Sequence, residues 1–189
     1  MSKKIGSLEV ICGQMFSGKT EELIRRVKRA LIGKKRVQVF KHSLDIRYGK
    51  DKKIFSHNGL SLKTEVVTKA RDILPKVHKK TEIVAIDEVQ WFGKELIEVI
   101  EKLISKEKQI IVSGLSTTFD RQPFDPIPQL MATADKVIKL SAICIICGKE
   151  AVFHKRILEK GPKDPALITP LLVGKINAYE ARCRVCFEK

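Results

Sequence analysis

One eight-residue segment has the spacing of a phosphate-binding loop, with two glycines separated by four residues and followed by lysine and a hydroxyl side chain. Its residues are Gly13, Gln14, Met15, Phe16, Ser17, Gly18, Lys19 and Thr20. The apolar run at 8–12 predicts a buried strand before the loop, and helical spacing of apolar residues predicts a helix from Thr20 onward. A chance match to the pattern would lack these flanks. A strand, a loop and a helix start in this order direct backbone N–H groups toward one point, where an anion can bind. We therefore expect a nucleoside triphosphate here, with Lys19 at the terminal phosphates and the Thr20 hydroxyl as a magnesium ligand.

A pair of acids, Asp87 and Glu88, directly follows an apolar run at 83–86. That run predicts a buried strand, and an acid at the end of such a strand holds magnesium from the side opposite the loop hydroxyl. Asp87 fits this role. Glu88 leaves the strand end in another direction and would accept the proton of an alcohol that receives the phosphoryl group. The alternatives are a solvated strand end for Asp87, and for Glu88 a second charge that tunes the magnesium site.

Four of the five cysteines form two C-x-x-C pairs, Cys144 with Cys147 and Cys183 with Cys186. Four thiolates on two tight turns suit tetrahedral zinc, and they leave no open coordination position for catalysis. The pairs are 35 residues apart, longer than the common spacing of about 15–20, so the metal would close a sizeable loop. Cys12 lies in the first expected strand and is most simply a buried apolar residue.

The first 140 residues alternate strand-like and helix-like segments, which predicts an α/β fold with a P-loop NTPase-like parallel sheet and helices on both faces. Further strands are expected at 37–40, 82–87, 109–114 and 136–140, and helices at 68–80 and 94–107. Pro75 should kink or shorten the first of these helices. The polar segment 41–63 is expected to be a long loop near the site. Because the cysteines cluster and the helical pattern stops near residue 141, we expect a nucleotide-binding domain at 1–140 and a small zinc-binding domain at 141–189.

The chain carries 37 basic and 22 acidic residues, a net charge of +15 that is spread evenly along the sequence. Aromatic residues make up only 6%, too few to suggest a platform for stacking bases. A lysine-rich solvated surface with a basic phosphate pocket is therefore favoured over a dedicated nucleic-acid face. No apolar run has the length of a membrane span, and the first strand is too short for a signal peptide. A cytoplasmic protein with no membrane partner is expected.

Taken together, these motifs resemble the thymidine kinases of the cellular, zinc-containing type. The family's loop G-P-M-[FY]-[SA]-G-K-[ST] is matched at 13–20 except at Gln14, and its D-E-x-Q-[FW]-F signature is matched at 87–92. The motif D-x-R-Y appears as Asp45-Ile46-Arg47-Tyr48, and G-L-x-x-x-F with a following P-F spans 114–124. Both cysteine pairs and Tyr179, four residues before the third cysteine, also match. The resemblance runs in collinear order from about residue 8 to 187.

The resemblance implies transfer of the γ-phosphoryl group of ATP to the 5′-hydroxyl of thymidine, giving dTMP, with Mg²⁺. It implies that Glu88 is the general base and that Arg47 approaches the phosphates together with Lys19. It also implies that the nucleotide is contacted by the phosphate loop and by Asp87, Glu88, Val89 and Gln90. For Arg47, a solvated loop arginine is the alternative.

The same resemblance implies a lasso-shaped loop at about 148–182 that wraps the nucleoside and recognises the base largely through main-chain groups. The residues expected to contact the nucleoside are Met15, Leu115, Phe119, Pro170, Leu171, Leu172, Val173, Gly174 and Tyr179. Family members are commonly homotetramers and are inhibited by the end product dTTP, so both properties are expected here.

Four positions depart from the family pattern. Gln14 replaces a proline, Ser116 stands where aspartate usually follows Gly-Leu, Lys175 replaces a glycine, and His154 stands where threonine commonly lines the pocket. These changes leave the phosphoryl-transfer residues intact and affect base specificity. A deoxynucleoside kinase with altered base preference therefore stays open, as does, more remotely, a zinc-bearing ATPase that acts on nucleic acid. A catalytically dead binding module conflicts with the retained Lys19, Thr20, Asp87 and Glu88.

Overall fold

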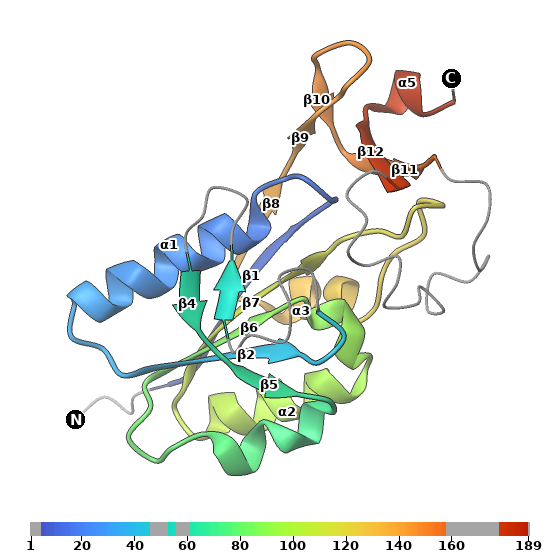
Figure 1. Ribbon diagram of the computed structural model, residues 1–189. Coiled ribbons are helices and arrows are strands. Elements are labelled where there is room, and N and C mark those ends of the chain that lie inside the picture. Colours follow the sequence, from blue (N-terminus) through green and yellow to red (C-terminus); the bar gives the residue numbers. More distant parts are fainter. Residues whose placement is uncertain (1–4, 46–52, 56–60, 158–177, 189) are drawn as a thin grey trace.

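A six-stranded parallel sheet forms the centre of the molecule (Figure 1). The computed structural model describes residues 5–45, 53–55, 61–157 and 178–188. The strands follow the order β5-β2-β6-β7-β1-β8, and every neighbouring pair is parallel. Their bounds are β1 Ser7–Gly13, β2 Val37–His42, β5 Glu65–Val67, β6 Ile83–Asp87, β7 Gln109–Leu115 and β8 Lys136–Leu140. The parallel sheet expected from the sequence is confirmed.

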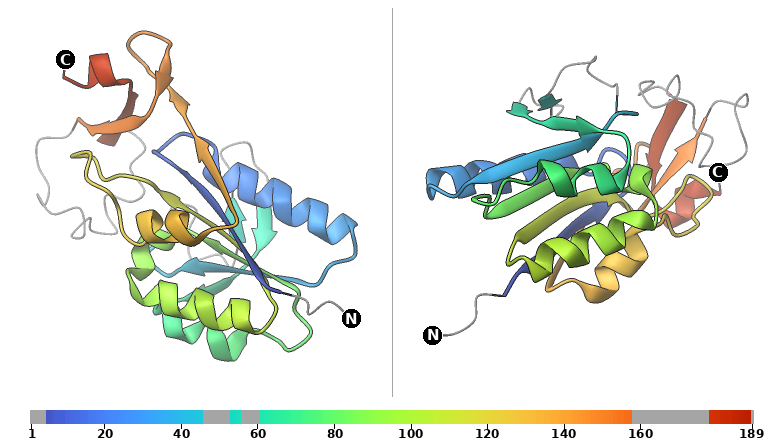
Figure 2. Two further views of the ribbon diagram at one scale, coloured as in Figure 1. Left: turned by 180° about the vertical axis from the view of Figure 1, so that it is seen from behind. Right: turned by 90° about the horizontal axis from the view of Figure 1, so that it is seen from below.

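Helices cover both faces of this sheet, as its near-continuous apolar strands require. Helix α1, Lys19–Ile32, packs on one face through Leu23, Ile24 and Val27. Helices α2, Glu95–Ser105, and α3, Ile127–Thr133, lie together on the other face (Figure 2). Strand β1 packs against the helices on both faces of the sheet. Ile11 lies in the core under α1, whereas Val10 and Cys12 lie in the core under α2 and α3.

Several local expectations were wrong. The stretch 68–80 forms two 3₁₀ turns, η1 Ala70–Asp72 and η2 Leu74–Lys76, and no α-helix, because Pro75 lacks the N–H that a longer helix would need. The segment 41–63 was expected to be a loop, but it contains the antiparallel hairpin of β3, Lys53–Phe55, and β4, Ser61–Lys63. Strand β5 and helix α3 were not predicted, and both are short.

The C-terminal part of the chain continues directly from β8 and forms two small antiparallel sheets. Strand β9, Ala142–Ile143, pairs with β10, Glu150–Ala151, and β11, Phe153–Arg156, pairs with β12, Tyr179–Arg182. A single helical turn, α5 Arg184–Phe187, follows. These elements lie beyond the carboxyl ends of β1 and β8 (Figure 1). Within the described part of the chain, no helix combines the length and apolar composition of a membrane span.

Candidate active site

The phosphate loop joins the end of β1 to the start of α1, as expected. Gly13 has φ 158°, and a Cβ atom there would lie 2.5 Å from the Leu140 carbonyl oxygen and 2.6 Å from the Ser17 hydroxyl, so no side chain fits. Gly18 has φ 78° and forms the N-cap of α1. Because glycine has no side chain to accept from the first N–H groups of the helix, these donors are left available to bind an anion.

Two side chains brace the loop from within. The Ser17 hydroxyl donates to the Gln14 carbonyl oxygen at 2.8 Å, and the Lys19 ammonium donates to the same oxygen at 2.7 Å. Lys19 is 8% exposed, so its charge lies inside the loop and not in solvent. The loop therefore combines helix N–H groups with a buried cation, an arrangement that attracts phosphate.

The carboxylate pair lies at the carboxyl end of β6, and Asp87 joins it to the loop. The Thr20 hydroxyl donates to Asp87 Oδ2 at 3.0 Å. The other oxygen, Oδ1, accepts from the Glu88 backbone N–H at 3.0 Å and from the Ser113 hydroxyl on β7. Asp87 is 1% exposed. The structure thus brings together the two residues that were predicted as magnesium ligands, Thr20 and Asp87.

Glu88 occupies an uncommon backbone conformation, with φ 53° and ψ 46° in the left-handed region. Such a conformation costs a non-glycine residue about 1–2 kcal/mol, and it turns the chain sharply out of β6. The Glu88 carboxylate is buried and accepts a hydrogen bond from the side-chain amide of Gln90. The neighbouring Val89 is fully buried in the apolar core, so any contact it makes with a nucleotide comes from its main chain.

The end of β2 contributes buried polar groups that the sequence analysis did not single out. Lys41 lies opposite Asp87 in the register of β2 and β6, is 3% exposed and donates to the Asp45 carbonyl oxygen at 3.3 Å. His42 Nε2 lies 2.8 Å from the Thr68 carbonyl oxygen, and burial lowers the pKa of this imidazole. Asp45, the first residue of the D-x-R-Y motif, is also buried. Arg47 lies outside the described residues.

The residues expected at the nucleoside come partly together. The Phe119 and Tyr179 rings have centroids 6.4 Å apart, although they are distant in sequence. Leu115 is buried at the end of β7, and Met15 is half-buried in the phosphate loop. The predicted main-chain contacts at 170–174 lie outside the described residues.

His154 packs edge-to-face against Tyr179, with ring centroids 5.7 Å apart. Burial, and after it the positive charge of Lys19, lower the pKa of His154 to about 3, so its imidazole is neutral at physiological pH. Burial also raises the pKa of Tyr179. Among the described residues, neither His154 Nδ1 nor the Tyr179 hydroxyl has a hydrogen-bond partner. Two packed aromatic rings therefore each carry a buried polar atom without a partner among the described residues, in a region that the charge of Lys19 reaches.

A hydrogen bond joins the C-terminal elements to the phosphate loop. The side-chain amide of Gln14 donates to the carbonyl oxygen of Ala151 on β10, and Gln14 is 1% exposed. The departure from proline at this position thus supplies a hydrogen bond that proline could not make.

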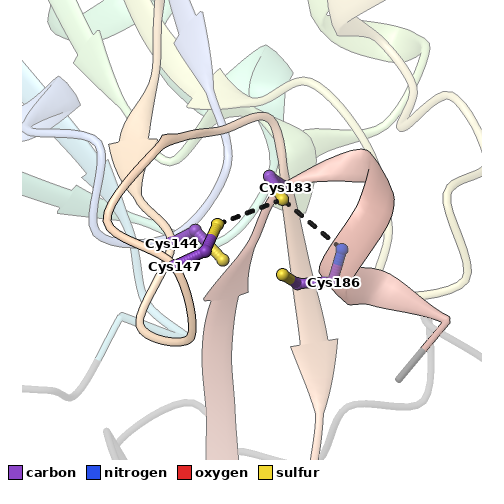
Figure 3. Close-up of side chains that lie close together, drawn as sticks. All are labelled: Cys144, Cys147, Cys183 and Cys186. Atoms are coloured by element: carbon purple, nitrogen blue, oxygen red, sulfur yellow. Dashed lines mark hydrogen bonds between the residues drawn. The ribbon is translucent and has the colours of Figure 1, made fainter.

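The four clustered cysteines fit a zinc ion. Cys144 and Cys147 come from the turn between β9 and β10, Cys183 follows β12, and Cys186 lies in α5 (Figure 3). Their sulfur atoms all lie within 4.8 Å of one another, and those of Cys147 and Cys183 are 3.6 Å apart. A tetrahedral site with zinc–sulfur bonds of about 2.3 Å needs sulfur atoms about 3.8 Å apart. The backbone N–H of Cys186 donates to Cys183 Sγ and holds the pKa of that thiol below its usual value, which favours the thiolate that a metal needs.

Comparison with known proteins decides the family. A family model described as thymidine kinase matches residues 6–187, nearly the whole chain. The chain belongs to the thymidine kinase family. It is therefore an enzyme of a nucleoside kinase family, and membership implies ATP as the phosphoryl donor and thymidine as the substrate.

Solved structures of other proteins share the fold of this chain. The flagellar accessory protein FlaH from Methanocaldococcus jannaschii is similar with a TM-score of 0.53 and 14% identity, over 78% of this chain and 76% of that chain. Domain III of the Thermotoga maritima replication initiation protein DnaA gives a TM-score of 0.45 at 18% identity, over 71% of this chain and 55% of that chain. The genome packaging NTPase B204 of Sulfolobus turreted icosahedral virus 2 gives 0.45 at 15% identity, over 71% and 74%. At 14% identity, the likeness to FlaH shows the fold alone.

Three site residues of this thymidine kinase family chain were missed by sequence reasoning. Ser113 binds Asp87, Lys41 lies opposite Asp87, and His42 is buried beside Phe92 with ring centroids 4.8 Å apart. In the sequence, each of these residues shows only as a polar residue within or at the end of an apolar strand. Their closeness to Asp87 follows from the strand order, which places β2 and β7 on either side of β6.

Replacing Cys183 by Ser should release zinc, because three thiolates and a hydroxyl bind the metal more weakly than four thiolates. Elemental analysis should find stoichiometric zinc in the wild type and little in the variant, and the KM for the nucleoside should rise. Cys12→Ala is the matched control, since Cys12 lies in β1 outside the cluster and its loss should leave the metal in place. Equal zinc content in the Cys183 variant and the wild type would contradict the four-cysteine site.

His154 should make the protein less stable in mild acid. The pKa of His154 is about 3 in the folded chain against 6.5 for an unperturbed imidazole, so the unfolded state binds the extra proton between these values. Stability is thus retained above pH 6.5 and lost as the pH falls, by about 2 kcal/mol at pH 5. Urea unfolding of wild type and His154→Phe from pH 7.5 to 5 should show the difference, with the exposed His78→Gln variant following the wild type. If the free energy of unfolding fell with pH equally steeply in the wild type and in His154→Phe, a buried neutral imidazole at His154 would be contradicted.

Proposed function

We propose that the chain transfers the γ-phosphoryl group of ATP to the 5′-hydroxyl of thymidine, giving dTMP, in a reaction that requires Mg²⁺. The observation that carries this proposal is the 3.0 Å hydrogen bond between Thr20 and Asp87, which joins the phosphate loop to the carboxylate pair. A nucleotide held by the loop would thus have its terminal phosphate next to Glu88. Membership of the thymidine kinase family supports the choice of nucleoside.

On the nucleotide side, we assign phosphate binding to residues 13–20 and to Asp87 at the end of β6, and residues 88–90 contribute through their main chain. The Lys19 ammonium, already inside the loop, would exchange its hydrogen bond with the Gln14 carbonyl for one to a phosphate oxygen. The Thr20 hydroxyl and the Asp87 carboxylate would hold magnesium, which neutralises charge on the phosphates when it is bound. Arg47 is assigned to the same phosphates from the family resemblance.

On the acceptor side, Glu88 is assigned as the general base. Glu88 follows Asp87, the proposed magnesium ligand, and its left-handed backbone turns the chain out of β6. Because the 5′-hydroxyl must lose its proton as the new P–O bond forms, a carboxylate within hydrogen-bond reach lowers the barrier. The proton passes from the 5′-oxygen to a Glu88 carboxylate oxygen while the 5′-oxygen bonds to the γ-phosphorus. The bond between the γ-phosphorus and the β,γ-bridging oxygen of ATP breaks, and ADP leaves.

The nucleoside pocket is assigned to Met15, Leu115, Phe119 and Tyr179, together with main-chain groups at 170–174. Support comes from the contact between Phe119 and Tyr179 and from the burial of Leu115 at the carboxyl end of β7. Apolar and aromatic walls suit the faces of a pyrimidine base and its sugar.

Further properties are proposed from the family resemblance alone: a lasso loop at about 148–182, feedback inhibition by dTTP and a homotetramer. Division into domains at 1–140 and 141–189 and a cytoplasmic location are proposed from the sequence. A structural zinc ion has the additional support of the cysteine geometry.

A deoxynucleoside kinase with altered base preference is the second candidate, and His154 is the observation that favours it. A buried neutral imidazole beside Tyr179 brings a bulky polar group to a position where the family commonly has threonine. A nucleic-acid-dependent ATPase has no comparable support.

The nucleoside preference is tested by kcat/KM for thymidine, deoxyuridine and deoxycytidine with saturating ATP and Mg²⁺. A thymidine kinase should prefer thymidine over deoxycytidine by at least about 10²-fold, since a pocket that hydrogen-bonds one base edge leaves groups unpaired with the other. Equal values for thymidine and deoxycytidine would replace the proposal by the broader kinase.

Glu88→Gln should lower kcat by about 10²- to 10⁴-fold, because an amide cannot accept the hydroxyl proton. Affinity for a non-hydrolysable ATP analogue, measured by calorimetry, should stay within about threefold of wild type, since the loop and the magnesium ligands are untouched. The control is Glu101→Gln, an exposed acid on α2, which should have wild-type kinetics. Near-normal kcat in Glu88→Gln would assign the base elsewhere.

A further inference from the structure

We propose that Gln90 is a positioning residue, which fixes the carboxylate of Glu88 against the main chain of the nucleoside pocket. The inference rests on the proposed function, because it assigns Gln90 a role through the general base. It differs from the nucleotide contact that the family resemblance implies for this residue.

Both ends of the Gln90 side chain are used. Its Nε2 atom donates to Glu88 Oε2, and its Oε1 atom accepts from the backbone N–H of Leu115 at 3.1 Å. Only the amide nitrogen can donate to a carboxylate, and only the amide oxygen can accept from an N–H group. The chemistry of the two partners therefore fixes which way the amide points. Because Gln90 is 4% exposed, water does not compete strongly for either bond.

The general base needs such support. Glu88 is followed by a short 3₁₀ turn, η3 Val89–Phe92, and its own backbone is in the left-handed region. A glutamate side chain has several rotatable bonds, and holding it in one geometry costs conformational entropy. The amide of Gln90 holds one carboxylate oxygen in place, so the base is oriented before the substrate arrives.

The other end of the amide reaches a rigid element. Leu115 is the last residue of β7, which pairs with β1 along its whole length and with β6. Leu115 is also assigned to the wall of the nucleoside pocket. Gln90 thus ties the position of the base to the strand that carries part of the pocket, so the distance between base and acceptor is set by the sheet.

Gly114 leaves the space that this arrangement requires. A Cβ atom at Gly114 would lie 2.9 Å from Gln90 Oε1 and 2.7 Å from Val89 Cγ2. Any side chain there would push the turn that carries Gln90 away from β7. Gly114→Ala is therefore an independent way to displace the amide without changing Gln90 itself.

The test compares Gln90→Leu, Gln90→Glu and Gly114→Ala with the wild-type chain. Gln90→Leu removes both hydrogen bonds. Gln90→Glu can still accept from the Leu115 N–H but sets a second carboxylate against Glu88. All three should lower kcat by about 10- to 100-fold, with ATP-analogue affinity and binding stoichiometry unchanged. Gln129→Leu is the control, since Gln129 bonds to Asp125 on the α3 side of the sheet. Dividing the measured rate by the concentration of sites that bind the ATP analogue corrects kcat for any unfolded fraction of a variant.

A double-mutant cycle with Glu88→Gln separates positioning from a merely structural role. If Gln90 acts through the base, adding Gln90→Leu to Glu88→Gln should lower kcat no further, because the group it positions is already gone. An equal loss in both backgrounds would overturn the proposal, as would full kcat in Gln90→Leu on a wild-type background. A wild-type chain that does not phosphorylate thymidine would instead refute the proposed function, so the two failures are distinguishable.

Discussion

The hydrogen bond between Thr20 and Asp87 is the contact on which the site depends. Strand β7 lies between β1, which leads into the phosphate loop, and β6, which ends at the carboxylates. With parallel strands about 4.8 Å apart, the two strand ends are separated by about 10 Å. Side chains must therefore bridge β7, and Thr20 does so by reaching Asp87 from the start of α1. The Ser113 hydroxyl on β7 donates to the other oxygen of Asp87, so the intervening strand also holds this carboxylate in place.

The C-terminal elements complete this edge of the sheet. Gln14 links the phosphate loop to β10, and the charge of Lys19 is felt by His154 on β11. The cysteine cluster closes the ends of β9, β12 and α5, which are otherwise small elements with few apolar residues to bury. Metal binding can supply the folding energy that such a small core lacks. A zinc ion held by these cysteines would therefore stabilise the elements that contact the phosphate loop through Gln14.

The residues predicted from sequence were those whose function depends on local spacing. The phosphate loop, the acids after β6 and the two cysteine pairs each lie within a few residues, so their geometry follows from one turn or one strand end. Ser113, Lys41 and the role of Gln90 depend on which strands are neighbours, and a single sequence does not show strand order. The 3₁₀ turns at 70–76 and the short strand β5 were missed because helical composition outweighed the effect of Pro75 and because β5 has only three residues. Departures such as His154 could be located but not interpreted until burial was known.

The central claim is that the loop and the carboxylates form one site in which ATP and a nucleoside react directly. It is tested most directly by the ratio of ADP to dTMP formed by the purified wild-type chain with ATP, Mg²⁺ and thymidine. ADP and dTMP should form in equal amounts, and little ADP should form when thymidine is left out. ADP formed at the same rate with and without thymidine, or stimulated by DNA in its place, would contradict it.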